Sequence, residues 1–171
     1  MRKIIFSSAM SLDGFIADTQ DGYAWIQGDG YTKLDTVKKW DYAAFLFTVD
    51  TVLMGRRCYE LNQHKDFVDQ KVLVATHQNM VDPSVTFIKD PVEVLTSLKE
   101  ASGKNIFVYG GAQLFQSILQ ANLIDEMIIG IVPVLLKDGI RLFEHSADLQ
   151  WALKEVIVEE GIVILTYHRR T

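Results

Sequence analysis

A glycine pair, Gly110 and Gly111, stands between an apolar run and a segment with helical character in "VYGGAQLF" (residues 108 to 115). The start of a helix presents unpaired backbone N–H groups and the positive end of the helix dipole. Glycine lets a ligand approach the backbone closely, because it carries no Cβ atom. A strand, a glycine pair and a helix in this order are therefore typical of a phosphate site. The same pattern is also compatible with a tight strand-to-helix turn that binds no ligand.

A third glycine, Gly55, ends another apolar run and is followed at once by Arg56 and Arg57. Guanidinium groups bind phosphate oxygens bidentately and stack on flat rings. Alternatively, the two arginines are solvated charges beside Glu60. Two anion sites at the strand ends of one sheet suit a dinucleotide with a diphosphate and a further phosphate on its adenosine ribose. The pattern favours NADPH over NADH as the cofactor.

The loop "SAMSLDGFIAD" (residues 8 to 18) leaves the first apolar run and combines polar residues, a glycine and two apolar residues, Phe15 and Ile16. A loop of this composition can fold over a flat ring. Asp13 followed by Gly14 is also typical of an ordinary turn.

These segments need a sheet to position them. Apolar runs rich in β-branched residues predict strands at residues 3 to 10, 51 to 55, 71 to 77, 85 to 89, 105 to 111 and 126 to 136, with a further pair within 153 to 169. Several runs are apolar almost throughout, which is typical of strands covered on both faces. The last two strands are separated by only "EEG", which predicts an antiparallel hairpin.

Helices are predicted at about residues 31 to 48, 91 to 101 and 112 to 121. The second of them has a complete start signal, because Asp90 suits the N-cap, Pro91 the first helical position and Glu93 a capping box. Together the elements predict an α/β fold, a three-layer sandwich with a mixed central sheet, flanking helices and a C-terminal β-hairpin. We expect residues 1 to 171 to form a single domain.

Composition narrows the range of partners. A net charge of −5 and an isoelectric point near 5.3 argue against a nucleic-acid partner, which needs a basic surface. No apolar stretch reaches the roughly 18 residues of a membrane-spanning helix. One cysteine and four scattered histidines predict no metal site. We expect a cytoplasmic protein that acts on a small molecule, since no signal peptide is visible.

Four segments taken together resemble the dihydrofolate reductase superfamily: "SSAMSLDGFIA", "VLMGRRCYE", "VYGGAQLFQSIL" and "LIDEMIIGIVPVLLKDGIRLF". Within it, the chain is similar to the C-terminal reductase domain of the bifunctional riboflavin-biosynthesis deaminase/reductase, from residue 3 to about residue 143. The resemblance implies a dihydrofolate reductase-like fold with NADPH across the strand ends. It also implies hydride transfer to a small heterocycle or ribosyl-pyrimidine, as in 5-amino-6-(5-phosphoribosylamino)uracil reductase.

The same resemblance assigns the cofactor contacts residue by residue. Gly55, Arg56 and Arg57 match the region of the adenosine 2′-phosphate, and the turn from Gly110 to Leu114 matches the diphosphate site. The predicted cofactor-binding residues are Ala9, Ile16, Gly55, Arg56, Arg57, Cys58, Thr76, Gly110, Gly111, Ala112, Gln113 and Leu114. Cys58 departs from the family, which commonly has a threonine there, and a thiol is a weaker donor to phosphate.

Asp13 and Asp41 are the candidate catalytic residues. Asp13 matches the family's loop aspartate, which is placed toward the substrate. Asp41 falls inside the apolar stripe, from Leu34 to Phe45, of the helix predicted from about residue 32. A carboxyl on the buried side of such a helix can have a raised pKa and hydrogen-bond a heterocycle, whereas a slight turn of the helix would leave Asp41 solvated.

Two alternatives to this reductase remain. Dihydrofolate reductase proper is disfavoured, because its carboxylate framed by Trp and Pro is not visible in the sequence. A dinucleotide-binding dimer without turnover would keep the glycine and arginine motifs and lack a productive acceptor site. Under each of these interpretations, the reductase included, we expect a homodimer, since the apolar final hairpin offers a β edge that a second copy can cover.

Overall fold

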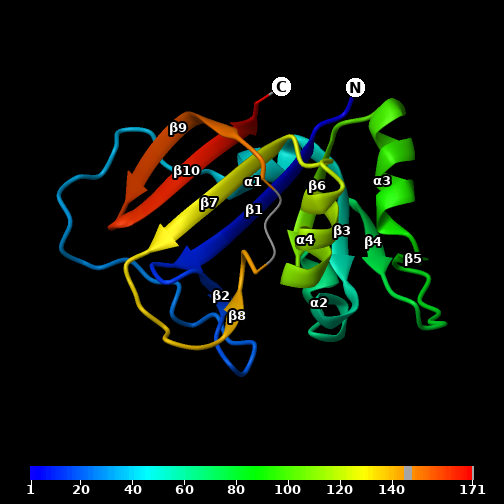
Figure 1. Ribbon diagram of the computed structural model, residues 1–171, viewed down its shortest axis with the longest axis horizontal. Coiled ribbons are helices and arrows are strands. Elements are labelled where there is room, and N and C mark those ends of the chain that lie inside the picture. The colour runs from blue at the N-terminus through cyan, green and yellow to red at the C-terminus, as the bar shows by residue number, and fades with distance from the viewer. Residues whose placement is uncertain (145–147, 171) are drawn as a thin grey trace. The chain divides into compact units, whose positions relative to one another are not determined.

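The computed structural model describes residues 1 to 144 and 148 to 170. In chain order the elements are β1 (Ile4–Ser11), β2 (Phe15–Ala17), α1 (Tyr42–Phe47), β3 (Val49–Gly55), α2 (Arg56–Glu60), the 3-10 helix η1 (Gln63–Asp66), β4 (Lys71–Ala75), β5 (Thr86–Ile88), α3 (Pro91–Glu100), β6 (Asn105–Gly110), α4 (Ala112–Gln120), β7 (Glu126–Val132), β8 (Ile140–Arg141), β9 (Trp151–Glu159) and β10 (Ile162–Arg169) (Figure 1).

The chain divides into two compact units, each formed by two segments that are far apart in the sequence. The first unit comprises Met1–Phe6 and Tyr42–Asp125, and the second comprises Ser7–Asp41 and Glu126–Thr171. Strand β1 contributes its first residues to the first unit and its remaining residues to the second.

The main sheet has the strand order β5-β4-β3-β6-β1-β7-β10-β9, and β2 pairs with β8 in a separate sheet. In the first unit β5, β4, β3, β6 and the start of β1 are parallel neighbours. In the second unit β10 pairs antiparallel with both β7 and β9. The predicted α/β fold, with its mixed sheet, flanking helices and C-terminal hairpin, is confirmed.

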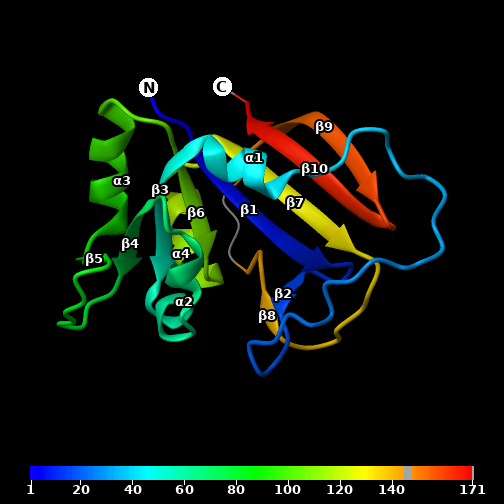
Figure 2. The same cartoon turned by 180° about the vertical axis from the view of Figure 1, so that it is seen from behind.

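The core of the first unit lies on both faces of its parallel strands. Figures 1 and 2, which view the chain from opposite sides, show α4 over one face and α1 over the other. Phe6 of β1 stacks on Phe115 of α4 with ring centroids 3.8 Å apart. Phe107 of β6 meets Phe45 of α1 edge-on at 5.1 Å. Helices on both faces explain why these strands are apolar throughout instead of alternating.

The predicted second and third helices are confirmed as α3 and α4. At the start of α3, the side chain of Asp90 accepts a hydrogen bond of 2.9 Å from the backbone N–H of Glu93, and Pro91 takes the first helical position. These are the N-terminal signals expected from the sequence. Within the part of the chain that the structure describes, no helix is long and apolar enough to cross a bilayer.

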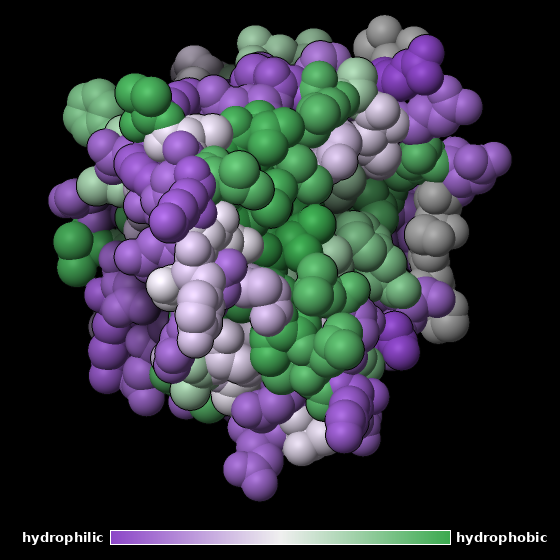
Figure 3. All heavy atoms as spheres, turned by 90° about the vertical axis from the view of Figure 1, so that its left-hand side faces the viewer, coloured by the Kyte–Doolittle hydropathy of each residue, from purple (hydrophilic) through white to green (hydrophobic). Residues whose placement is uncertain are grey.

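The second unit leaves apolar side chains of its edge strand β9 open to solvent. Leu153 is 54% exposed and Val156 is 44% exposed. They stand opposite Tyr167 and Leu165 of β10 in the antiparallel register, so the four side chains share one face of the sheet. Figure 3 faces the side of the molecule on which β9 and β10 lie in Figure 1, and it shows hydrophobic residues gathered in a band.

The predicted helix at residues 31 to 48 is wrong over most of its length, because only α1 is helical. Leu34 and Val37, expected to be buried, are 79% and 104% exposed. The reason is a tertiary interaction with the C-terminal hairpin. The backbone N–H of Thr36 donates to the carbonyl of Val158 at 2.9 Å.

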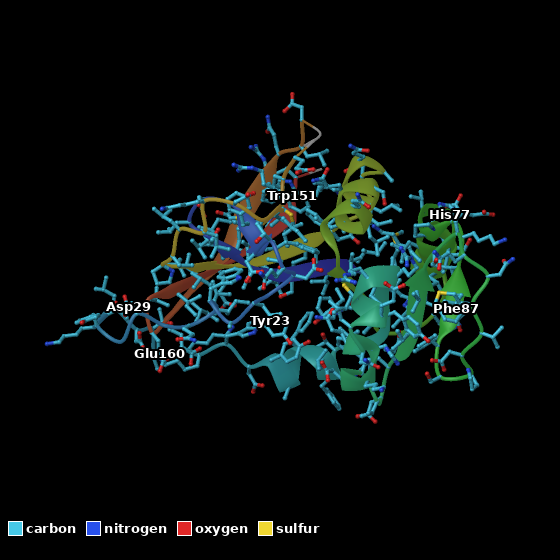
Figure 4. The ribbon with its side chains drawn as sticks, turned by 90° about the horizontal axis from the view of Figure 1, so that it is seen from below. Tyr23, Asp29, His77, Phe87, Trp151 and Glu160 are labelled. Carbon is cyan, nitrogen blue, oxygen red and sulfur yellow. The ribbon has the colours of Figure 1, made fainter. Side chains whose placement is uncertain are left out.

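A second hydrogen bond fixes the beginning of this extended segment. The backbone N–H of Asp29 donates to the carbonyl of Glu160 at 2.8 Å, and Figure 4 shows these two residues side by side. The side chain of Asp29 also accepts from the backbone N–H groups of Tyr31 and Thr32. Such local side-chain bonds compete with helix formation. The chain from residue 29 to 36 therefore lies along the C-terminal hairpin and does not form a helix.

Candidate functional site

Three glycines lie close together in the first unit: Gly55 ends β3, Gly110 ends the neighbouring strand β6, and Gly111 is the N-cap of α4. Met54, the residue before Gly55, pairs with Gly110 in the register of β3 and β6. A Cβ added to Gly55 would lie 3.5 Å from the backbone N of Gly111 and 3.7 Å from the carbonyl O of Gly110. Gly110 has φ +139°, a conformation that favours glycine, and the peptide bond to Gly111 is cis.

The glycine pair borders open space. A Cβ added to Gly110 or to Gly111 would meet no atom within 4 Å. Helix α4 begins directly after the pair, and its N-cap residue Gly111 supplies no side-chain cap to the first backbone N–H groups. Exposed backbone at the start of a helix, with nothing filling the space above it, is the arrangement that holds a phosphate group. We call Gly55, Gly110, Gly111 and the start of α4 the glycine cradle.

Two arginines follow Gly55 at the beginning of α2, and both are exposed. Arg56 forms an ion pair with Glu60 one turn further along, with an N···O distance of 2.5 Å and side chains 43% and 35% exposed. An exposed pair of this kind contributes only about 0.3–0.5 kcal/mol. The predicted alternative, a charge beside Glu60, therefore describes Arg56 in this structure, and an anionic ligand can replace Glu60 at small cost.

Thr76 and Cys58 complete the predicted set in the first unit. Thr76 follows β4, whose last residue Ala75 pairs with Gly55 of β3. The Thr76 side chain is buried, and its Oγ1 accepts a hydrogen bond of 3.1 Å from the backbone N–H of Gln78. Cys58 lies half-buried in α2. The predicted residues of this unit thus gather at the carboxyl ends of β3, β4 and β6, where open α/β sheets bind their ligands.

The second unit contains the remaining candidates, Ala9 on β1, Asp13, Ile16 on β2 and Asp41. The carboxylate of Asp13 is surrounded by donors. Its Oδ1 accepts from the hydroxyl of Ser11 at 2.6 Å and from the backbone N–H of Leu136 at 3.1 Å, and its Oδ2 accepts from the backbone N–H of Lys137 at 2.8 Å.

The donors around Asp13 keep its carboxylate ionised at neutral pH. The hydrogen bond from Ser11 has the largest effect on the pKa of Asp13, and those from Lys137 and Leu136 have smaller ones. Together they outweigh the effect of burial and lower the pKa of Asp13 to about 2. At neutral pH this carboxylate accepts hydrogen bonds and has no proton to donate. The geometry favours an anchoring role for Asp13 rather than a role as a proton donor.

Other contacts anchor the same loop to residues 134 to 142. Leu12 donates its backbone N–H to the carbonyl of Val134, and Leu142 donates to the carbonyl of Gly14. The guanidinium of Arg141 lies 4.5 Å from the ring centroid of Phe15. The loop that sequence reasoning placed over a flat ring is therefore held along its length by a segment more than a hundred residues away.

Asp41 does not occupy the predicted position. It is exposed and immediately precedes α1, so no helix carries it on a buried face. The prediction that it lies inside an apolar helical stripe is wrong, for the reason given above for residues 31 to 41. Within the described part of the chain, no group of three or more His, Cys, Asp or Glu residues could hold a metal ion.

Sequence reasoning missed Ser11, Tyr59 and Asp82. Ser11 could have been found, since a serine two residues before an aspartate can bond to it locally. The hydroxyl of Tyr59 donates to Asp82 across 23 positions at 2.8 Å. No local sequence pattern predicts a hydrogen bond between residues so far apart in the chain.

The comparisons with known proteins agree with this geometry. Residues 2 to 163 match the model of the RibD C-terminal domain. The chain belongs to this family. The uncharacterized protein YwjB of Bacillus subtilis (strain 168) is 36% identical over 154 residues, which are 84% of each chain. The uncharacterized protein YyaP of the same organism is 30% identical over 98% of this chain and 95% of its own.

Solved structures extend the likeness of this RibD C-terminal domain. A protein of Shewanella sp. PV-4, whose name assigns it provisionally to riboflavin biosynthesis, is 27% identical over the full length of both chains with a TM-score of 0.81. Dihydrofolate reductase of Enterococcus faecalis, solved with NADP(H), has a TM-score of 0.69 at 16% identity over 99% of this chain and 97% of its own.

A bifunctional enzyme shares the fold over part of its length. The diaminohydroxyphosphoribosylaminopyrimidine deaminase/5-amino-6-(5-phosphoribosylamino)uracil reductase of Thermotoga maritima has a TM-score of 0.70 at 15% identity, over 99% of this chain and 57% of its own. At such identities the likeness shows the fold alone. Together with the family match, these findings confirm the resemblance drawn from the four sequence motifs.

Proposed function

We propose that the protein is an NADPH-dependent reductase that transfers a hydride to a small heterocyclic or ribosyl-pyrimidine substrate, similar to 5-amino-6-(5-phosphoribosylamino)uracil reductase. Membership of the RibD C-terminal domain family supports a reductase of the riboflavin-pathway type. The observation that carries the proposal is the glycine cradle, where a Cβ on Gly110 or Gly111 would enter open space. A diphosphate needs that space.

The residues present fit the cofactor. The backbone N–H groups at the start of α4 bind the diphosphate, and the exposed guanidinium groups of Arg56 and Arg57 bind the phosphate on the adenosine ribose. When bound, NADPH supplies the hydride, and the protein supplies binding and orientation. Contacts of Ala9 and Ile16 with the nicotinamide stay predictions, as does the part of Cys58 in holding phosphate.

Asp13 acts on the protein rather than on the substrate. Its ionised carboxylate holds the loop at residues 11 to 18 against the backbone of Leu136 and Lys137. The proton that accompanies the hydride therefore comes from another group or from water.

The two alternatives differ in their consequences. Dihydrofolate reductase proper is not favoured, because Asp41 is exposed and residues 31 to 41 form no helix that could carry a pterin-binding carboxylate. A dinucleotide-binding dimer without turnover would bind NADPH and leave it unoxidised with every pyrimidine and pterin acceptor offered.

The proposal is tested by cofactor oxidation with 5-amino-6-(5-phosphoribosylamino)uracil and related pyrimidines. Replacing Arg56 by alanine is expected to raise the KM for NADPH about tenfold and to leave that for NADH unchanged, because a hydrogen bond from a charged group to phosphate is lost. The matched control is Arg170→Ala, which removes a guanidinium that donates a hydrogen bond to the side chain of Gln150 in the second unit. An unchanged KM for NADPH in the Arg56 variant would show that this anion site is wrongly assigned.

A further inference from the structure

The loop at residues 76 to 85, between β4 and β5, carries Thr76 at its start. Its first backbone N–H, from Thr76, donates to the carbonyl of Ile88 at 2.9 Å. The stretch from Asn79 to Val81 has no hydrogen-bond partner among the described residues, and Val81 is 99% exposed. Figure 4 labels His77 near the beginning of this loop and Phe87 just beyond its end, both at the β4–β5 edge of the first unit.

Tyr59 of α2 connects to this loop. Its hydroxyl donates to Oδ2 of Asp82 at 2.8 Å. Its ring stacks on His64 at a centroid distance of 4.6 Å and meets Phe87 of β5 edge-on at 5.3 Å. Two aromatic neighbours thus hold the ring in place while the hydroxyl reaches the middle of the loop.

Hydrogen bonds from Ser84 hold the Asp82 carboxylate in the position and the charge state in which it accepts from Tyr59. Its Oδ1 accepts from the hydroxyl of Ser84 at 2.6 Å and from the backbone N–H of Ser84 at 2.8 Å. These two bonds, and then the one from Tyr59, lower the pKa of Asp82 to about 2. The bond to Asp82 in turn raises the pKa of Tyr59. At neutral pH a protonated phenol therefore donates to a charged carboxylate, so the hydrogen bond of 2.8 Å is assisted by that charge.

We propose that the Tyr59–Asp82 hydrogen bond holds the loop at residues 76 to 85 against α2, and that Tyr59 is a positioning residue for the phosphate on the adenosine ribose of the cofactor. The inference rests on the proposed function. Its basis is that the bond joins α2, which carries Arg56 and Arg57, the predicted ligands of this phosphate, to the loop that begins at Thr76, which the resemblance places near the adenine ribose.

A selective effect follows from this placement. The diphosphate ligands of the glycine cradle lie on β3, β6 and α4 and do not depend on the loop. Loosening the loop therefore weakens the contacts to the additional phosphate of NADPH and spares those that NADPH and NADH share. Because specificity is a difference between two affinities, the ratio of the two dissociation constants reports on Tyr59 directly.

The test compares Tyr59→Phe with wild type by titration of NADPH and of NADH. The phenylalanine keeps the ring contacts with His64 and Phe87 and removes only the hydroxyl. The dissociation constant for NADPH is expected to rise about fivefold, the effect of one lost hydrogen bond, and that for NADH to stay as in wild type. The matched control is Tyr42→Phe in α1, where the phenol has no hydrogen-bond partner among the described residues, and neither constant should change.

A second variant separates positioning from simple destabilisation. Asp82→Ala should lower NADPH affinity as Tyr59→Phe does, and the double variant should be no worse than Asp82→Ala alone, because both changes break one bond. The inference is overturned if Tyr59→Phe leaves NADPH affinity unchanged, if it weakens NADPH and NADH equally, or if the two changes add. Wild-type protein that binds neither nucleotide would overturn the proposed function itself, before any variant is compared.

Discussion

The carboxylate of Asp13 accepts hydrogen bonds from Ser11, Leu136 and Lys137, and its pKa is lowered from the ordinary 3.8 to about 2. A group whose pKa is lower in the folded than in the unfolded chain stabilises the folded state when it is ionised. The contribution of Asp13 is therefore complete above pH 4 and is lost as the pH falls from 4 toward 2.

Replacing Asp13 by asparagine tests this anchoring role. The amide removes the charge and turns one acceptor oxygen into a donor that faces a backbone N–H group. We expect a lower Tm at pH 7, by a few degrees, and a difference from wild type that shrinks as the pH falls from 4 to 2. Thermal unfolding followed by circular dichroism at several pH values measures both. A difference that stays constant down to pH 2 would contradict the role given to the charge.

At the scale of the elements, a substitution in the glycine cradle can weaken nucleotide binding without lowering the stability of the fold. Gly111 has φ −78° and ψ −167°, which any residue adopts, and a Cβ there meets nothing within 4 Å. Gly111→Ala should therefore keep the wild-type Tm. Its methyl group enters the space assigned to the diphosphate, so we expect NADPH and NADH to bind about tenfold more weakly. Calorimetry and nucleotide titration measure the two effects.

The control for this change is Gly130→Ala in β7, whose Cβ would meet Ile162 and Ile164 at the ordinary distances of 3.6 and 3.8 Å. It should alter neither nucleotide's affinity. If Gly111→Ala binds both nucleotides as wild type does, the space above the cradle holds no diphosphate.

The elements that local sequence signals specify were predicted correctly, and those that depend on long-range contacts were not. The apolar runs and the signals at Asp90 and Pro91 are local, and they predicted the parallel strands and α3 correctly. The segment at residues 31 to 41 followed a helical pattern but pairs with Val158, more than a hundred positions away. A long-range backbone hydrogen bond leaves no trace in local periodicity. The anchoring of Asp13 by Leu136 and Lys137 was missed for the same reason, although the loop itself was recognised.

For the whole molecule, we expect a homodimer formed through the exposed face of β9 and β10. Thr36 already occupies the edge of β9 at Val158, with hydrogen bonds in both directions. The apolar side chains of Leu153 and Val156 remain exposed on the sheet face, and large exposed apolar patches mark interfaces. Light scattering at micromolar concentration should give twice the mass of one chain.

A charged substitution in this face tests the dimer. Val156→Asp should shift the protein to the mass of one chain, because a carboxylate in a dry interface has no partner. Val81→Asp, at a position 99% exposed in the first unit, is the control and should leave the mass unchanged. Wild-type protein with the mass of a single chain would rule out the dimer.

Nucleotide binding by the wild-type protein decides whether the cradle and the two arginines form a dinucleotide site. The measurement is a titration of NADPH and NADH against the purified chain, followed by quenching of the fluorescence of its three tryptophans. We predict saturable binding of NADPH and affinity for NADH weaker by about tenfold or more, since NADH lacks the phosphate that Arg56 and Arg57 would bind. If neither nucleotide binds, Gly110 and Gly111 form only a turn and the reductase assignment is wrong.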